Sequence, residues 1–237
     1  MRKNHILDFL SLLCVLLFVA NFVNGQIQDD NKLRKYEIEA HFTDLNLDDF
    51  NVVNEYYRTK GIDTRLLLQP QKEVGFGIRA GYNINKYIAV EAEANLLPRF
   101  TNLSISDNFF KRGGIKAQFL VGAKIGKKLK IKEKEKFGFF GKIRPGFIRF
   151  DRFARIRLIQ EIPPNTSVIS TPRVAAFFNL DVGGVVEYYP TKRTFIRADF
   201  GDTIIHYGKP GDSSFRPLNP TFTTHNFQTS IGFGFRF

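Results

Sequence analysis

The chain has 237 residues, of which 43% are apolar, 14% aromatic and 24% charged, and its formal net charge is +12 at pH 7. The aromatic content excludes a disordered chain, and the single cysteine excludes a disulfide scaffold or a cysteine-rich zinc module. A mean hydropathy of −0.19 excludes a bundle of transmembrane helices, although 26 phenylalanines are more than a soluble domain of this size needs.

The first 25 residues are typical of a secretory signal peptide. A basic start precedes an apolar stretch over residues 9–20, and compact residues lead up to Gly25. We therefore expect cleavage after Gly25, leaving residues 26–237 as one mature domain without a cysteine. A membrane anchor is the alternative, but the stretch is shorter than the ~20 residues of a spanning helix. Export of so basic a chain favours anionic membrane surfaces or phosphorylated glycolipids over nucleic acid as partners.

Apolar and polar residues alternate with a period of two along most of the remaining chain. In residues 36–43 every second side chain is apolar, which gives a strand one apolar and one polar face. About 9–11 residues suffice for a strand tilted by ~45° to cross the apolar layer of a bilayer. We predict eight strands, over residues 36–43, 74–82, 88–96, 115–125, 137–147, 176–188, 195–205 and 227–237.

The predicted connections alternate between long and short. The long ones span residues 45–72, 99–114, 151–173 and 208–224, and the short ones surround residues 83–86 and 190–193. This asymmetry is typical of bacterial outer-membrane barrels, in which the short turns and both termini are periplasmic. The fourth connection, residues 127–136, is intermediate in length and rich in lysine, and we expect an extended, soluble hairpin tip there.

If the apolar face of each strand points to lipid, fourteen charged side chains point into the barrel. They are Glu37, Glu39, Arg79, Glu91, Glu93, Lys116, Lys124, Lys142, Arg144, Asp181, Glu187, Arg197, Asp199 and Arg236. Seven are acidic and seven basic, which suits a lumen of low dielectric, where an unpaired charge is costly. Asp202 departs from the alternation and indicates a bulge or the membrane rim late in the seventh strand.

Aromatic residues gather where the predicted strands meet the short turns. They are Tyr82, Tyr87, Phe137, Tyr188, Tyr189, Phe195, Phe235 and Phe237. This placement indicates an aromatic girdle at a membrane surface, and ordinary strand aromatics are the alternative.

The last eight residues resemble the C-terminal assembly signal of outer-membrane barrels. Ser230 supplies its polar residue, Gly232 its glycine, and Phe235 and Phe237 its two aromatics. Together with the alternating strands, and with residues 75–83 and 87–93 as the most typical stretches, the mature chain resembles the eight-stranded outer-membrane β-barrel family, the OmpA-like N-terminal and OmpX-like group. The resemblance implies recognition of the last strand by the barrel-assembly machinery. Because nothing follows Phe237, it implies no peptidoglycan-binding domain of the full-length OmpA type.

Some barrels that this scaffold resembles are lipid A deacylases, which use a His-x-Ser pair because serine needs an adjacent base to become a nucleophile. The histidines of the predicted mature chain are followed two positions later by other residues: His41 by Thr43, His206 by Gly208 and His225 by Phe227. A palmitoyltransferase-like constellation, whose members come from different loops, is not tested by spacing. Scattered histidines without thiols also disfavour a metal site, and we expect no catalytic residue and no cofactor.

An eight-stranded barrel is just wide enough to be filled by its own side chains. The fourteen charged groups, together with Phe140 and Phe195, are therefore expected to leave no sizeable channel. At the end with the long loops, arginines alternate with apolar residues at Arg149, Arg152, Arg155 and Arg157. Arginine forks suit the phosphates of lipopolysaccharide in the outer leaflet, and a solvated rim is the alternative.

The sequence thus predicts an all-β, eight-stranded antiparallel transmembrane barrel in the outer membrane of a Gram-negative bacterium. Its expected role is structural or in surface interactions, without enzymatic activity and with a lumen plugged by paired charges. Its expected partners are outer-membrane lipid and lipopolysaccharide, with the surface ligand unidentified. A lipid A-modifying enzyme or a narrow pore on the same barrel is the first alternative, and a secreted soluble barrel of the lipocalin type is the second.

Overall fold

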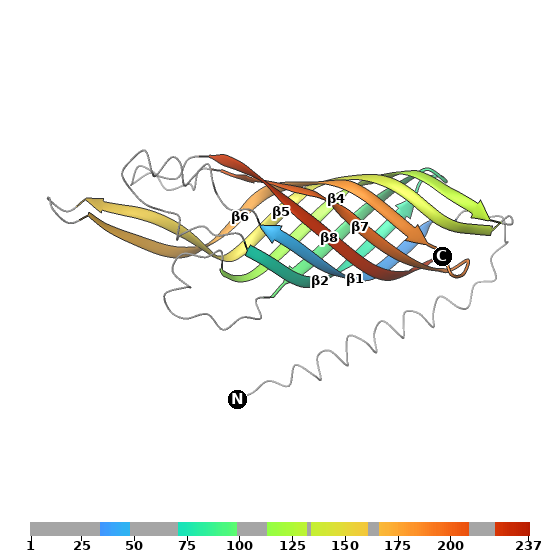
Figure 1. Ribbon diagram of the computed structural model, residues 1–237, viewed down its shortest axis with the longest axis horizontal. Helices are drawn as coiled ribbons and strands as arrows, with labels where there is room; N and C mark the ends of the chain where they lie inside the picture. The colour runs from blue at the N-terminus through green and yellow to red at the C-terminus, as the bar shows by residue number, and fades with distance from the viewer. Residues whose placement is uncertain (1–33, 48–70, 99–112, 132–133, 161–165, 209–220) are drawn as a thin grey trace, which may run out of the picture.

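The computed structural model describes residues 34–47, 71–98, 113–131, 134–160, 166–208 and 221–237, and of residues 71, 113, 152–160 and 166–173 it describes the backbone alone. All eight predicted strands are present (Figure 1). They are β1 (Tyr36–Leu47), β2 (Gln71–Asn83), β3 (Ile88–Leu97), β4 (Gly113–Ile131), β5 (Lys134–Gln160), β6 (Thr166–Tyr188), β7 (Thr194–Tyr207) and β8 (Phe222–Arg236). Among the described residues, no helix is long and apolar enough to cross a membrane.

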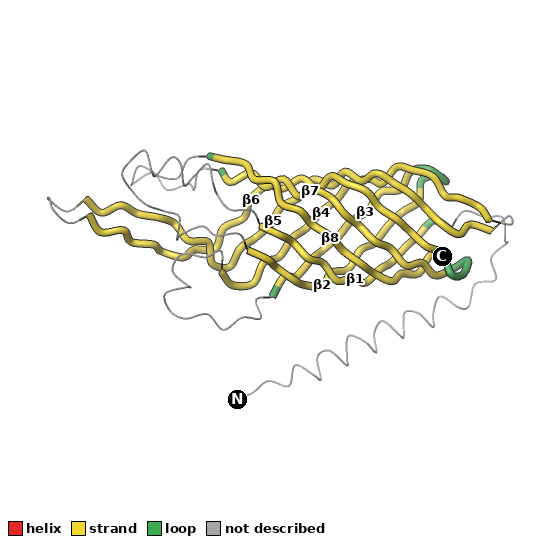
Figure 2. Tube along the Cα trace, in the orientation of Figure 1, coloured by secondary structure: helices red, strands yellow, loops and turns green. Residues whose placement is uncertain are grey.

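The strands form one closed barrel in sequence order, each antiparallel to its neighbours (Figure 2). The first and last strands close it, and their pairing includes two backbone hydrogen bonds of 2.9 Å between Tyr36 and Phe237. The predicted fold class, an all-β, eight-stranded, up-and-down antiparallel barrel, is confirmed.

The strand register sets the tilt of the barrel. Following paired residues once around the barrel from Tyr36 leads back to β1 at Asn46, a stagger of ten residues. For eight strands this stagger corresponds to a tilt of about 40°. Phe137 and Phe147 both face outward on β5 and are ten residues apart, which is about 25 Å along the barrel axis. This is the height of the apolar band of outer-membrane barrels.

Exposed aromatic side chains mark both edges of this apolar band. At the short-turn end they are Tyr36, Tyr82, Tyr87, Phe137, Tyr188 and Phe237, and toward the opposite end Phe76, Phe119, Phe147, Phe178 and Phe227, while Phe42, Phe139, Phe200 and Phe233 are exposed between the two edges. Two aromatics assigned to the girdle from the sequence are buried in the lumen, Tyr189 and Phe195. Tyr189 follows the outward-facing Tyr188, so the alternation of the strand turns it inward. Phe195 fills the lumen, which is the other role expected of it.

Two predicted connections are largely strand. Residues 151–173, expected as a long loop, continue β5 to Gln160 and pair it with β6 from Thr166, because the alternation of apolar and polar residues persists there. This ribbon extends beyond the rest of the barrel (Figure 1). Residues 127–136, expected as a hairpin tip, extend β4 to Ile131 and β5 from Lys134.

The structure places no bulge at Asp202. The register of β7 is regular on both sides of it, with Asp202 opposite Val182 on β6 and Phe227 on β8. Its carboxylate lies 2.5 Å from Nδ1 of His225 on the outer wall. The other expectation, that the membrane rim lies late in this strand, agrees with the polar pair of Asp202 and His225. Lys72 and Asp44 form another outward-facing ion pair, of 2.8 Å, toward the same end of the barrel.

Candidate functional site: the ionic core of the barrel

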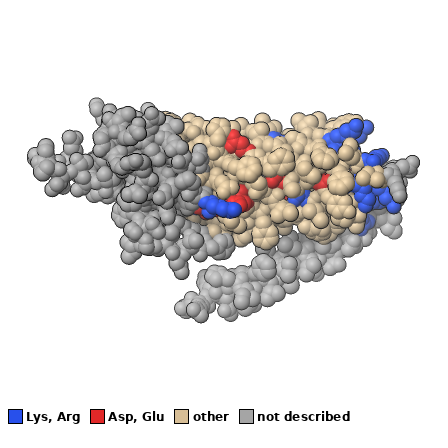
Figure 3. Space-filling view, in the orientation of Figure 1, with Lys and Arg blue, Asp and Glu red and all other residues tan. Residues whose placement is uncertain are grey.

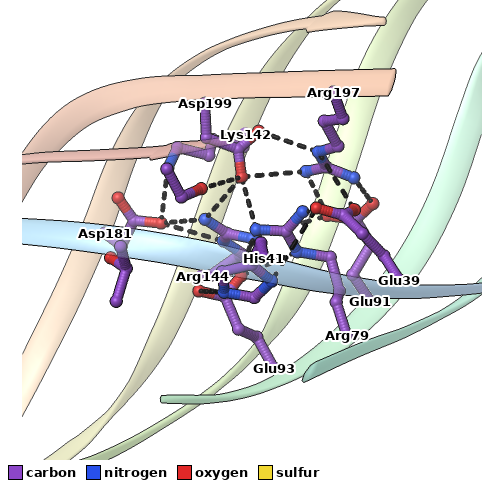
Figure 4. Close-up of polar contacts among 12 residues, drawn as sticks. Glu39, His41, Arg79, Glu91, Glu93, Lys142, Arg144, Asp181, Arg197 and Asp199 are labelled. Carbon is purple, nitrogen blue, oxygen red and sulfur yellow. Dashed lines mark hydrogen bonds and ion pairs between the residues drawn. The ribbon is translucent and has the colours of Figure 1, made fainter. Parts of the chain in front are cut away.

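Alternation brings charged side chains from most strands into one lumen. All fourteen charged residues assigned to the interior from the sequence are buried, with at most 6% of their surface exposed. The middle of the lumen holds three arginines, one each from β2, β5 and β7, surrounded by carboxylates from four strands (Figure 4). These carboxylates are Glu39, Glu91, Glu93, Asp181 and Asp199.

Arg79 connects strands that are not neighbours. Its Nε donates to Glu93 at 2.7 Å, its Nη1 to Glu39 at 2.6 Å and its Nη2 to Asp199 at 2.5 Å. Glu93 and Glu39 lie on the adjacent strands β3 and β1, whereas Asp199 lies across the lumen on β7. The planar guanidinium suits this role because its five N–H groups have fixed directions.

Arg144 and Arg197 extend the network on either side. Arg144 donates to Asp181 at 2.5 and 2.8 Å and also to Glu93, and Lys142 lies 2.9 Å from the same Asp181. Arg197 holds both oxygens of Glu91 at 2.5 and 3.0 Å and donates to Asp199 at 2.8 Å. Because each of these three arginines is bonded to at least two carboxylates, the cost of removing their charges from water is offset within the lumen.

A second layer of charge lies between this centre and the short turns. Lys124 is 2.8 Å from Glu37, 2.6 Å from Glu187 and 3.3 Å from Glu91. The hydroxyl of Tyr189 donates to Glu187, and burial together with that carboxylate raises the pKa of Tyr189, which lies beyond the end of β6. Carboxylates on β1, β3 and β6 thus share one ammonium group.

Arg236 lies at the base of the lumen, and its Cα is paired with that of Glu37 on β1. Its guanidinium instead donates to Glu135 at 2.8 Å and to the carbonyl of Lys192, and it lies 4.0 Å from the ring of Tyr189. Register therefore does not dictate the ion pair, since a long side chain reaches past its direct neighbour.

Toward the long-loop end neutral polar side chains replace most of the charged ones. His41 Nε2 lies 2.7 Å from the Asn95 side-chain oxygen, Asn95 donates to Gln118 at 2.9 Å, and Gln118 and Gln228 are hydrogen-bonded at 3.2 Å. Thr203 also donates to Gln228, at 2.6 Å. Several apolar inward side chains at this end of the barrel are also fully buried, among them Leu45, Leu47, Leu97, Leu120, Ile148, Phe150 and Ile205.

The amide layer and one ion pair were missed by the sequence reasoning. Glu73 is buried and lies 2.7 Å from Lys116. Extending the alternation of β2 by two residues from Gly75 would have placed Glu73 inward. Neutral amides carry no such signal, because glutamine and asparagine are equally common on solvated faces.

Glycines on the inner face make room for this filling. A Cβ on Gly77 would lie 2.0 Å from the Asn95 side-chain oxygen, and one on Gly232 would lie 2.3 Å from Glu39 Oε1. At these two positions, on β2 and β8, the charged and polar neighbours occupy the space that a side chain would need.

The four residues of the C-terminal motif lie on two faces of the last strand. Ser230 is buried and donates to Asp199 at 3.4 Å, and Gly232 faces the lumen beside Glu39. The Phe235 ring lies 5.1 Å from that of Phe233, and the exposed Phe237 ring stacks on Tyr36 at 5.8 Å. In the folded barrel these residues complete both the lumen and the outer wall.

Deleting Phe237 should lower the yield of folded barrel in the outer membrane several-fold. The deletion removes the two backbone hydrogen bonds to Tyr36 and the aromatic stacking that close β8 onto β1. Immunoblotting of unboiled outer-membrane fractions measures the folded form. The matched control, Phe237→Tyr, keeps the ring and should assemble normally, and equal yields for wild type and deletion would show that the terminal residue is dispensable.

The arginines proposed to contact phosphates are only partly within the described residues. Arg149 is outward-facing and exposed, and its guanidinium lies 3.8 Å from Asp151. The side chains of Arg152, Arg155 and Arg157 lie outside the described part of the structure, which gives only the backbone of β5 there. Thus the structure places Arg149 at the long-loop end of the outer wall and leaves the other three as a prediction.

The described residues contain no group of three or more His, Cys, Asp or Glu side chains placed to hold a metal ion. His41 and Thr43, the nearest approach to a His-x-Ser pair, both face the lumen. His41 is bonded to Asn95, and the Thr43 hydroxyl accepts from Gln228 at 3.1 Å. This pair is therefore directed away from the lipid-facing wall.

Comparisons with solved structures return other barrels of the outer membrane. One is Ail, the attachment invasion locus protein of Yersinia pestis, in complex with the heparin analogue sucrose octasulfate (13% identity, TM-score 0.46, covering 86% of this chain and 100% of Ail). Neisserial surface protein A is 11% identical, with a TM-score of 0.45 and coverages of 85% and 97%. OprG of Pseudomonas aeruginosa is also 11% identical, with a TM-score of 0.40 and coverages of 87% and 97%.

No curated protein sequence matches the chain. The family model described as "Outer membrane protein beta-barrel domain" matches residues 11–237, nearly the whole length. The chain therefore belongs to the outer membrane protein beta-barrel domain family.

Proposed function

We propose that this outer-membrane barrel is a closed, non-enzymatic protein with a structural or surface-interaction role. The proposed mature form begins after residue 25, has both termini and the short turns in the periplasm, and is assembled by the machinery that recognises its last strand. The long connections at the opposite end then face the cell exterior, where loops carry binding specificity.

The observation that carries the proposal is the ionic lattice across the lumen. Arg79, Arg144 and Arg197 reach carboxylates on both sides of the barrel, so side chains bridge the whole cross-section. The space enclosed by Glu39, Glu91 and their neighbours admits no water-sized sphere. A permeation path for ions or solutes would have to break several of these bonds at once.

The outer wall supports insertion in a bilayer. It exposes large apolar side chains over a band about 25 Å high, bordered by aromatics at both edges. A soluble barrel of the lipocalin type would bury its apolar face and expose the charged one. Here the arrangement is reversed, since the charges are buried and Phe42, Ile78 and Ile231 are 59–69% exposed.

Contact with lipopolysaccharide phosphates through arginine is the proposed surface interaction. Arg149 stands on the outer wall at the long-loop end, next to the exposed Phe147. An arginine beside an aromatic edge suits the boundary between acyl chains and phosphates, because its planar fork binds phosphate oxygens in pairs.

The refolded protein should show heat-modifiable migration on SDS gels and negligible conductance in planar bilayers. The folded barrel resists unboiled SDS because its backbone hydrogen bonds form a closed ring, and the ionic lattice blocks the lumen. Identical migration of boiled and unboiled samples would contradict the claim that the protein forms a barrel in membranes. Stable single-channel steps in most insertions would overturn the closed lumen, and release of fatty acid from lipid A by the purified protein would overturn the non-enzymatic role.

A further inference from the structure

The lysine-rich ribbon at the short-turn end is the feature that the proposed function does not use. We define the lysine hairpin as residues 127–131 of β4 and 134–136 of β5. Pairing of β4 with β3 ends at Ile125, and pairing of β5 with β6 begins at Phe137. Apart from one hydrogen bond of 2.9 Å from the Tyr189 amide to the Lys136 carbonyl, the described ladder of the lysine hairpin runs between its own two strands, beyond the closed barrel (Figure 1).

The outer face of the lysine hairpin continues the apolar wall of the barrel. Ile125, Lys127, Leu129 and Ile131 share the outward face of β4 by alternation, and Leu129 and Ile131 are 45% and 51% exposed. Phe137, the partner of Leu129 on β5, is exposed as well. A hairpin tip standing in water gains nothing from exposing such side chains, so this apolar stripe favours contact with the membrane.

Cations surround this apolar stripe. Lys127, Lys130 and Lys134 are exposed on the lysine hairpin, where Glu135 is the one acidic residue among those described and is bonded to Arg236. Figure 3 shows lysine and arginine gathered at this end of the molecule. Around the other short turns lie Lys35, Lys86, Lys192 and Arg193.

The order of residue types along the barrel matches the layers of a membrane surface. The apolar band ends at exposed tyrosines, and cations follow directly, as where Lys86 Nζ lies 4.9 Å from the ring of Tyr87. Tyrosine prefers the headgroup boundary, and lysine extends its apolar stem along the wall while its ammonium reaches phosphate. A polymer in the aqueous phase offers carboxylates or phosphates but no apolar layer continuous with the wall.

We propose that the lysine hairpin and the cations of the short-turn end form a docking surface for anionic phospholipid headgroups of the adjacent leaflet. Leu129 and Ile131 insert at the boundary of the acyl chains, and Lys127, Lys130 and Lys134 bind phosphate groups. This replaces the expected soluble hairpin tip by a membrane-bound one. It rests on the proposed insertion in a bilayer but not on the proposed orientation.

The test uses the full chain refolded in phosphatidylcholine bilayers that contain spin-labelled phosphatidylglycerol or spin-labelled phosphatidylcholine. Electron paramagnetic resonance gives the fraction of each label immobilised at the protein surface, and hence the preference for the anionic lipid. A lysine near an anionic surface strengthens the local association of an anionic lipid about five-fold. Because the spin labels report on the whole perimeter of the barrel, we expect an average preference for the anionic lipid of about two-fold. It should fall toward one in high salt.

The decisive variant is Lys127→Gln/Lys130→Gln/Lys134→Gln, which should lose most of the preference. Two controls should retain it: the matching triple arginine variant, which keeps the charges, and Lys72→Gln, which removes an exposed lysine from the other end of the barrel. An unchanged preference in the triple glutamine variant would overturn the inference. So would a preference lost in the arginine variant, or binding of wild type to soluble anionic polymer without lipid preference.

Heat-modifiable migration is measured on every sample first. A wild type that does not insert contradicts the proposed function, whereas an inserted wild type without preference for anionic lipid contradicts only this inference. A second variant, Leu129→Ser/Ile131→Ser, keeps the cations and should weaken the preference by holding the lysine hairpin less closely to the headgroups. An undiminished preference there would overturn the role of the apolar stripe.

Discussion

The Arg144→Ala variant is expected to lose about 3–5 kcal/mol of unfolding free energy, the cost of leaving buried charges without their partner. Arg144 donates to Glu93 and Asp181 and lies within 3.5 Å of Asp199, and its side chain is almost wholly buried. Alanine leaves these carboxylates in a lumen of low dielectric with Lys142, Arg79 and Arg197 as the remaining nearby cations. Urea unfolding in lipid vesicles, followed by unboiled SDS gels, measures the change.

The matched control is Arg149→Ala, which removes an arginine from the outer face of the same strand. Its one described partner is Asp151 at 3.8 Å on an exposed surface, so the expected change is within about 0.5 kcal/mol. Adding Asp181→Ala to Arg144→Ala should recover part of the loss, since it removes one negative charge and restores the balance of acidic and basic groups in the lumen. Equal unfolding midpoints for Arg144→Ala and Arg149→Ala would show that the ionic lattice does not stabilise the barrel.

The Gly146→Ala variant is expected to destabilise the barrel by about 3 kcal/mol, at the upper end of the effect of overpacking. A Cβ at Gly146 would lie 1.8 Å from the carbonyl oxygen of Phe119 and 2.9 Å from the Cα of Leu120. Both atoms belong to the backbone of β4, so a whole strand would have to move away. The loss of the β4–β5 pairing there should appear as a lower urea midpoint and a smaller folded band.

The Gly141→Ala variant separates the clash from the general effect of the substitution. Gly141 lies on the same strand, but the nearest atoms to its Cβ would be 3.9 Å away, which is ordinary contact. Because alanine has less freedom than glycine in the unfolded chain, this change should be neutral or slightly stabilising. A Gly146→Ala protein as stable as the Gly141→Ala protein would show that β4 moves away from the added Cβ without a measurable loss of stability.

Much of the fold is predictable from the sequence because a period of two is a local property. Each strand reveals which of its own side chains share a face, so Glu39, Arg79 and Asp199 are assigned to the lumen without knowledge of the neighbouring strands. Tyr189 was misplaced because it was grouped with Tyr188 by proximity to the turn, whereas the alternation itself turns it inward. Two connections were predicted too long because their many charged residues resemble those of a solvated loop, although the alternation continues into them.

The partners of each charge are not predictable in this way. The sequence contains no direct measure of the ten-residue stagger, and the stagger decides which residues of distant strands meet across the lumen. Lys124 and Glu37 lie on strands that are not neighbours, yet they are 2.8 Å apart. Arg236 shows the second limit, since its guanidinium bypasses the paired Glu37 and binds Glu135. Side-chain length and local crowding decide such cases.

The bonds of Arg79 have a consequence for how the barrel forms. A hairpin of β2 and β3 can pair Arg79 with Glu93, but its bond to Asp199 exists only when β7 stands across the lumen. A partly inserted sheet would therefore hold several unpaired charges at the depth of the acyl chains, where each is costly. Closing the last seam and neutralising the interior become a single cooperative step, so half-built intermediates are sparsely populated and the finished barrel unfolds all at once.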